Sequence, residues 1–250
     1  MEENAYLISM VAGAFYLIVA CRLLQLSRRT REQPELLLGI YFAATGPWYL
    51  FYNVPYLFGL ESMPQLLEQG IEWVYAVGVI PYLLFIRSAF RPGTNWATAL
   101  VAIGTVCLLV GAFLSSTTGG GFSNSTDDLG YRIEWIGYTL PCLWMSYEGF
   151  AAHAAARKRF RTGLCDAIVA NRYLLFGWFG VCQTAACAAD LLWAHGNSTE
   201  AASTAIASGL LSGTEIASVA VLGLAFFPPP SYRRWIDRRS ASLSAPTEGA

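Results

Sequence analysis

The feature that most constrains the fold of this chain is one carboxylate inside an apolar segment. Residues 201–227 are long enough to cross the hydrocarbon core of a bilayer, about 30 Å, and Glu215 is their only charged residue. A charge at that depth costs at least ~2.5 kcal/mol unless it faces protein or water. In a helix, Glu215 shares one stripe with Thr204, Ser208, Ser212 and Ser218. The stripe is therefore predicted to point inward, with other helices around it.

The rest of the chain supplies such helices. It is 55% hydrophobic and only 13% charged, with a mean hydropathy of +0.42, a composition typical of a polytopic membrane protein. Backbone groups in lipid must be paired within their own segment, so apolar spans are predicted to be helical. The apolar segments are 5–26, 35–60, 70–90, 96–115, 131–155, 171–194 and 201–227. We therefore predict an all-α membrane protein, a seven-transmembrane-helix bundle over residues 1–228, and a basic, then disordered cytoplasmic tail over 229–250.

Basic residues indicate the orientation of this bundle. They follow the first, third, fifth and seventh segments, and of the sixteen only Arg132 falls on the other side. By the positive-inside rule, the N-terminus is predicted to lie outside and the C-terminus in the cytoplasm. The expected location is the inner or plasma membrane of the cell, as a multi-pass protein.

The two halves of the sequence resemble each other. A basic loop, PELLLG, AFRP and Trp96 in the first half match a basic loop, RYLLFG, AFFP and Trp235 in the second. Both halves are predicted to begin outside. The pattern predicts a parallel repeat of three plus one plus three helices, in which the fourth helix is the linker. Chance similarity at membrane boundaries is the alternative interpretation.

Three motifs stand at predicted membrane boundaries: AFRP at 89–92, RTGLCDAIVANRYLLFGW at 161–178 and AFFPPPSYRRW at 225–235. In these motifs and in its layout, the chain resembles an uncharacterised group of bacterial seven-helix integral membrane proteins. The resemblance implies the seven-helix layout and no activity.

Several kinds of chemistry are disfavoured by the residues available. A retinal Schiff base needs a lysine inside a span, but the only lysine, Lys158, lies in a basic loop. His153 and His195 are the only histidines and lie far apart in the sequence, so a zinc site is not expected. The serines of residues 201–227 have no histidine base at a plausible depth. We expect no enzyme, no cofactor, no bound metal and no nucleic-acid partner.

Aromatic and polar residues at helical spacing predict a ligand-binding site instead. Tyr41, Trp48 and Tyr52 share one face of the second segment, and Tyr75 and Tyr82 share one face of the third. The predicted ligand-binding residues are Glu215, Asp190, Gln183, Tyr41, Trp48, Tyr52, Tyr75 and Tyr82. Glu72, near the predicted outer boundary, is expected to be a solvated carboxylate.

Two function classes fit this pattern. The first is a small-ligand-binding receptor or sensor, since aromatic faces beside carboxylates suit a cationic or amphipathic ligand; its cytoplasmic loop and tail would contact a protein partner. The second is a secondary transporter, in which Glu215 would carry a proton during the cycle. Under a third interpretation, Glu215 is a neutral, hydrogen-bonded packing residue. The lipid bilayer is a partner under all three.

Overall fold

The computed structural model describes residues 2–57, 64–117, 128–162, 164–196 and 201–244. Within these ranges the chain forms eight helices. They are α1 (Glu2–Thr30), α2 (Gln33–Leu57), α3 (Gln65–Phe90), α4 (Asn95–Thr117), α5 (Leu129–Arg161), α6 (Ala167–Gly196), α7 (Ala201–Phe226) and α8 (Pro230–Ser244).

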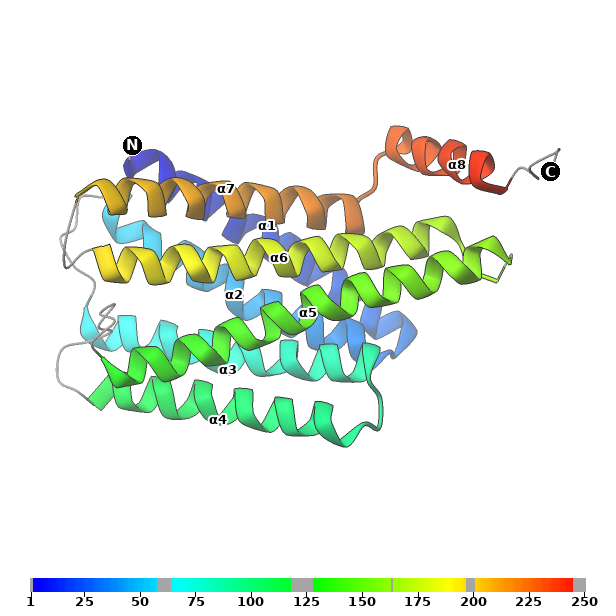
Figure 1. Cartoon of the computed structure of the whole chain (residues 1–250). Coiled ribbons are helices and arrows are strands. Elements are labelled where there is room, and N and C mark those ends of the chain that lie inside the picture. Colours follow the sequence, from blue (N-terminus) through cyan, green and yellow to red (C-terminus); the bar gives the residue numbers. More distant parts are fainter. Residues whose placement is uncertain (1, 58–63, 118–127, 163, 197–200, 245–250) are drawn as a thin grey trace.

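The first seven helices run alternately up and down and form a closed ring (Figure 1). Each packs against the next in the chain, and α7 packs back against α1. An additional contact between α3 and α5 leaves α4 at the edge of the bundle. We call the end at which α1, α3, α5 and α7 begin the N-terminal end, and the opposite end the basic end. At the basic end, α5 and α6 extend beyond the other helices and α8 lies beside them.

The sequence-based segments match α1 to α7, and the largest differences are at the start of α3, which begins earlier, and at the end of α5, which ends later. The helices continue through Pro47, Pro81 and Pro141. Three successive prolines end α7, as expected. A helix in the tail was not predicted: α8 begins at the last of these prolines and continues to Ser244, and the end of the predicted disordered segment, 245–250, lies outside the described residues. Proline suits the first turn of a helix, where its missing N–H would have no partner.

The outer surface of the bundle is that of a membrane protein. Large apolar side chains are exposed along several helices, among them Val11 at 65%, Val106 at 58%, Phe113 at 57% and Ile216 at 56%. Five helices of the described chain, α1, α3, α4, α6 and α7, are long and apolar enough to cross a membrane. The protein is therefore a polytopic, all-helical membrane protein. Whether α2 and α5 also cross, and in which direction, stays a prediction, as does the internal repeat.

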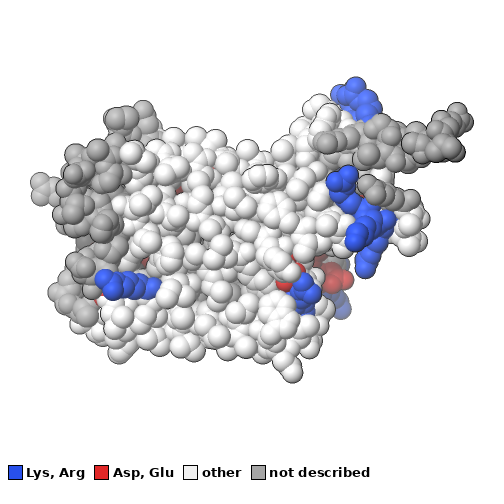
Figure 2. All heavy atoms as spheres, viewed as in Figure 1, with Lys and Arg blue, Asp and Glu red and all other residues white. Residues whose placement is uncertain are grey.

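On the surface of the bundle, charged side chains lie mostly at the two ends. Figure 2 shows Lys and Arg side chains mostly at the basic end, over the ends of α5 and α8, with an almost uncharged surface between the ends. This distribution is the one that the bilayer requires, because only the ends of spanning helices reach water and headgroups.

Glycines bring three of the helices into backbone contact. A side chain at Gly111 of α4 would overlap the backbone of Glu134 in α5, and one at Gly149 of α5 would overlap the backbone of Gly177 in α6. Small residues are common where membrane helices approach this closely. These contacts fix the position of α5, which carries much of the polar core described next.

Candidate functional site

Glu215 lies inside the bundle, as its sequence context predicts. It is 2% exposed, and the Ser9 hydroxyl of α1 lies 2.9 and 2.8 Å from its two carboxylate oxygens. On the predicted stripe, Ser218 is fully buried and Ser208 and Ser212 are half-buried, while the side chain of Thr204 lies outside the described residues. The inward direction of this stripe is therefore confirmed at Glu215 and Ser218.

Gln183 extends this polar region toward the middle of the bundle. Its amide nitrogen donates to the Tyr16 hydroxyl at 3.2 Å and to the Ser218 hydroxyl at 3.1 Å. Gln183 of α6 thus links Tyr16 of α1 to Ser218 of α7, and Ser218 lies one turn from Glu215 on the same face of α7.

A row of stacked rings crosses the bundle from α2 to α5. Trp48 stacks on Tyr75 with centroids 4.7 Å apart, and Tyr75 lies 4.7 Å from Tyr138. Each end of this row donates a hydrogen bond to a carboxylate. The Trp48 indole reaches Glu72 at 3.1 Å, and the Tyr138 hydroxyl reaches Glu134 at 2.7 Å. We call Trp48, Tyr75 and Tyr138 the aromatic row.

Glu72, Glu134 and Asp190 form what we call the acidic cluster. They come from α3, α5 and α6, and the charge of Glu72 interacts with those of the other two. Glu72 is 5% exposed and Glu134 is 1% exposed; Asp190 is half-buried and accepts a hydrogen bond of 2.9 Å from Tyr131. Within the described part of the chain, no basic side chain forms an ion pair with any of the three or with Glu215. Among the described residues, these four carboxylates accept side-chain hydrogen bonds from neutral donors only.

The opposite half of the bundle is filled by apolar and aromatic side chains. Phe179 contacts the rings of Phe42 and Tyr82, and Phe176 contacts those of Phe85 and Phe226. Tyr41 and Tyr82 lie between the two halves and stack at 4.5 Å. The hydroxyl of Tyr82 is buried and has no hydrogen-bond partner among the described residues.

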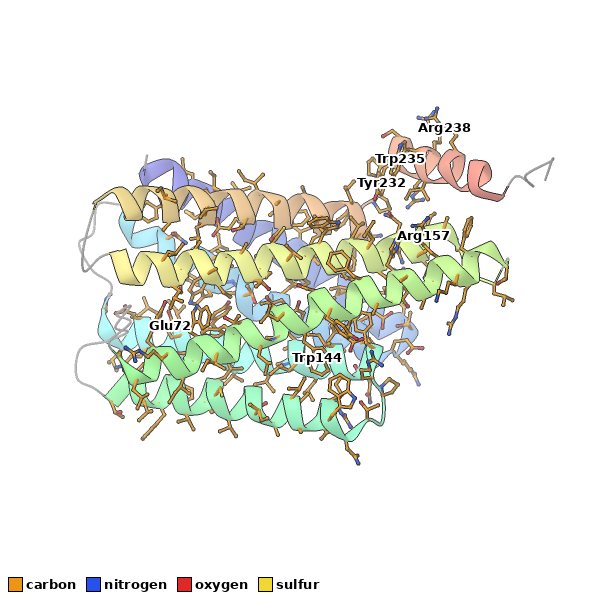
Figure 3. The ribbon with its side chains drawn as sticks, viewed as in Figure 1. Glu72, Trp144, Arg157, Tyr232, Trp235 and Arg238 are labelled. Atoms are coloured by element: carbon orange, nitrogen blue, oxygen red, sulfur yellow. The ribbon has the colours of Figure 1, made fainter. Side chains whose placement is uncertain are left out.

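Below this apolar half, an ion pair closes the basic end. Arg91, in the turn after α3, donates to Glu148 of α5 at 2.8 Å, and the Trp144 indole donates to the same oxygen at 3.2 Å. The hydrogen bond and charge of Glu148 raise the pKa of Arg91 above its ordinary value, so this arginine stays charged. Figure 3 shows Glu72 in the N-terminal half and Trp144 in the half near the basic end.

The predicted site residues whose side chains are described fall into three groups. Trp48 and Tyr75 belong to the aromatic row and Asp190 to the acidic cluster beside it, while Gln183 belongs with Glu215. Tyr41 and Tyr82 form the boundary with the apolar half. Tyr52 lies on α2, but its side chain is outside the described residues. The expectation of a solvated Glu72 was wrong, because α2 and α5 cover it and Trp48 binds it.

Sequence reasoning missed the contribution of α5 to the site. Tyr131, Glu134 and Tyr138 are spaced by three and four residues and share one helix face, the same signal that identified Tyr75 and Tyr82. Ser9 was also missed. Ser9 carries little signal by itself, because a single hydroxyl in an apolar helix is common.

Within the described residues, no group of three or more His, Cys, Asp or Glu side chains is arranged to hold a metal ion. Comparison with family models, curated proteins and solved structures finds no match for this chain. The site must therefore be interpreted from its own geometry.

Proposed function

We propose that this membrane protein is a receptor or sensor for a small organic cation, which binds at the acidic cluster from the N-terminal end of the bundle. The observation that carries the proposal is the acidic cluster itself: Glu72 and Glu134 are buried at the two ends of the aromatic row, Asp190 is half-buried, and none of the three forms an ion pair with a basic side chain of the described chain.

Buried carboxylates require neutralisation. In the interior of a membrane protein, like charges repel strongly and each loses its hydration, so they need protons or a cation. Trp48 and Tyr138 stabilise one oxygen each of Glu72 and Glu134, but they bring no positive charge. A bound ammonium group would supply that charge. The neighbouring aromatic rings favour an organic cation over a strongly hydrated metal ion.

The distribution of polarity along the bundle favours access from one end. The acidic cluster occupies the N-terminal half, whereas the half near the basic end is packed with phenylalanine rings and holds the ion pair of Arg91 and Glu148. If the predicted orientation holds, a ligand would arrive from outside. The cytoplasmic ends of the helices would then pass the signal to a protein partner.

The test is ligand-induced stabilisation of the purified full chain by tetramethylammonium, choline and putrescine. A binder at 100 times its dissociation constant is expected to add about 2.7 kcal/mol to the free energy of unfolding. Glu72→Gln and Glu134→Gln should weaken this effect at least tenfold in apparent affinity. Glu32→Gln, at an exposed position at the basic end of the bundle, serves as the matched control. No stabilisation by any cation, or equal affinity in all variants, would reject the proposal.

One observation favours a carrier as the second candidate. Glu215 lies near the middle of α7, and Ser9, Tyr16, Gln183 and Ser218 continue its polar surroundings. A carboxylate at that depth could bind and release a proton as the protein changes its conformation. Proton and solute flux in proteoliposomes, compared between the natural chain and Glu215→Gln, separates the two. Flux that disappears in the variant supports a carrier, and cation binding without flux supports the receptor.

A further inference from the structure

The tail helix α8 is docked onto the bundle by its first turns. Asn171, near the start of α6, donates a hydrogen bond to the Tyr232 hydroxyl, and Ile236, one turn later on the same face of α8, is 6% exposed. Tyr232 stacks on Trp235 with centroids 5.8 Å apart and an interplanar angle of 18°. The first turns of α8 are therefore held against the start of α6.

The side of α8 that faces away from this contact is basic. Arg233, Arg234 and Arg238 are exposed, and Arg157 of α5 is exposed nearby. Figure 3 shows Arg157 on the side of α5 and α6 that faces α8, while Arg238 lies on the far side of α8. We call the exposed arginines of α8, Arg233, Arg234 and Arg238, the α8 basic face. Over residues 155–172 and 228–240 the sequence has nine basic residues (Arg157, Lys158, Arg159, Arg161, Arg172, Arg233, Arg234, Arg238 and Arg239) against two acidic ones, Asp166 and Asp237.

The depth of this face follows from its connection to α7. Only Phe227, Pro228 and Pro229 separate the last residue of α7 from the first residue of α8, so the first turns of α8 lie where the spanning helix leaves the hydrocarbon. Trp235 is 46% exposed, and arginines lie next to it in the sequence. Exposed tryptophan and tyrosine beside basic residues are typical of the headgroup layer of a membrane.

We propose that the α8 basic face binds the phosphate headgroup of an anionic phospholipid in the leaflet at the basic end. Arginine binds phosphate through directed, charge-assisted hydrogen bonds. The exposed ring of Trp235 would lie at the level of the glycerol and upper acyl chain. An acidic protein segment would match the charge, but the proximity to the end of α7 and the exposed tryptophan favour a lipid. The proposal is independent of the ligand site in the acidic cluster.

The test measures lipid preference at the surface of the full chain in bilayers. The protein is reconstituted in phosphatidylcholine with a minor amount of spin-labelled phosphatidylglycerol or spin-labelled phosphatidylcholine. The motionally restricted fraction then gives a relative association constant. We expect the natural chain to prefer phosphatidylglycerol. In the double variant Arg234→Gln/Arg238→Gln the preference should fall by up to about fivefold for each arginine removed.

The matched control is Arg28→Gln/Arg29→Gln, which removes two exposed arginines at the same end of the bundle but on α1. This control should retain most of the preference. Equal thermal denaturation of all variants establishes that they fold. The proposal is overturned if the natural chain shows no preference, if both double variants lose it equally, or if glycerol 1-phosphate in the buffer displaces the lipid. Displacement by polyglutamate would overturn it in favour of an acidic protein partner.

Discussion

At the scale of single residues, the carboxylates of the polar core are bound by neutral hydrogen-bond donors. Glu215, Glu72, Glu134 and Asp190 accept hydrogen bonds from Ser9, Trp48, Tyr138 and Tyr131, all of them neutral donors. Hydroxyl and indole donors stabilise a carboxylate without cancelling its charge. The core therefore stays responsive to a proton or a cation in a way that an arginine-paired carboxylate, such as Glu148, does not.

The bond between Ser9 and Glu215 can be tested by a double-mutant cycle. Ser9→Ala removes the donor, and Glu215→Met replaces the carboxylate by an apolar chain of similar length. We expect a coupling energy of about 0.6 kcal/mol, the average for hydrogen bonds between membrane helices, and at most about 1.7 kcal/mol. The measurement is the free energy of unfolding of the four chains in mixed micelles.

The control for this cycle replaces Glu215→Met by Ser212→Ala, a half-buried position one turn earlier on α7. Its coupling to Ser9→Ala should be close to zero. A coupling of the same size in both cycles would contradict a direct bond.

The burial of individual residues could be predicted where exposing them to lipid would cost free energy. The inward direction of Glu215 followed from the price of a charge in lipid, and the burial of Tyr82 and Gln183 followed from helical spacing. Glu72 was misjudged because its position near a helix end suggested water. Which side chains cover a helix end depends on neighbouring helices, and one sequence does not reveal how these are arranged.

At the scale of helices, close packing along α5 determines the geometry of the site. Gly111 of α4 lies against the backbone of Glu134, and Gly149 of α5 lies against Gly177 of α6. A methyl group at either place would have to push two backbones apart. Because α5 carries Tyr131, Glu134 and Tyr138, a shift of this helix would move one of the three carboxylates of the acidic cluster, the tyrosine that binds Asp190, and one end of the aromatic row.

Gly149→Ala is therefore expected to destabilise the fold by about 1–3 kcal/mol, as overpacking does in cores. Gly209→Ala is the matched control, since a side chain at Gly209 of α7 would meet no atom within 4 Å. It should leave stability unchanged or raise it slightly, because alanine favours helix more than glycine does. Thermal denaturation of the two variants in the same detergent makes the comparison. Equal loss of stability in both would disprove the packing role.

The helices themselves were the most predictable level of the structure. Twenty-residue apolar segments leave the backbone no alternative to a helix in lipid, and α1 to α7 follow the predicted segments. The helix α8 was not predicted, because its polar sequence carries no apolar stripe beyond Tyr232 and Ile236. Its docking depends on Asn171 of α6, sixty-one residues earlier in the chain.

At the scale of the whole molecule, the two ends differ in chemistry, and this difference leads to a prediction of orientation. In a cysteine-free background, Cys165 restored at the basic end should react with a membrane-impermeant maleimide only from the cytoplasmic side. Asp128→Cys, at the first turn of α5, should react only from outside. Labelling of intact cells detects cysteines that face outside, and labelling of inverted vesicles detects cysteines that face the cytoplasm. Reaction of both cysteines from one side would contradict seven crossings.

The contact between α1 and α7 has a consequence for the order in which the protein is made. Every other contact in the ring joins helices that are consecutive in the chain, so these pairs can form while synthesis proceeds. Ser9 and Glu215 are 206 residues apart, and their bond must wait until the last spanning helix has entered the bilayer. Until then Ser9 is without its acceptor and the bundle is open along one side. The bond between Ser9 and Glu215 therefore belongs to the last contact between helices that forms in the newly synthesised protein, the contact that closes the ring.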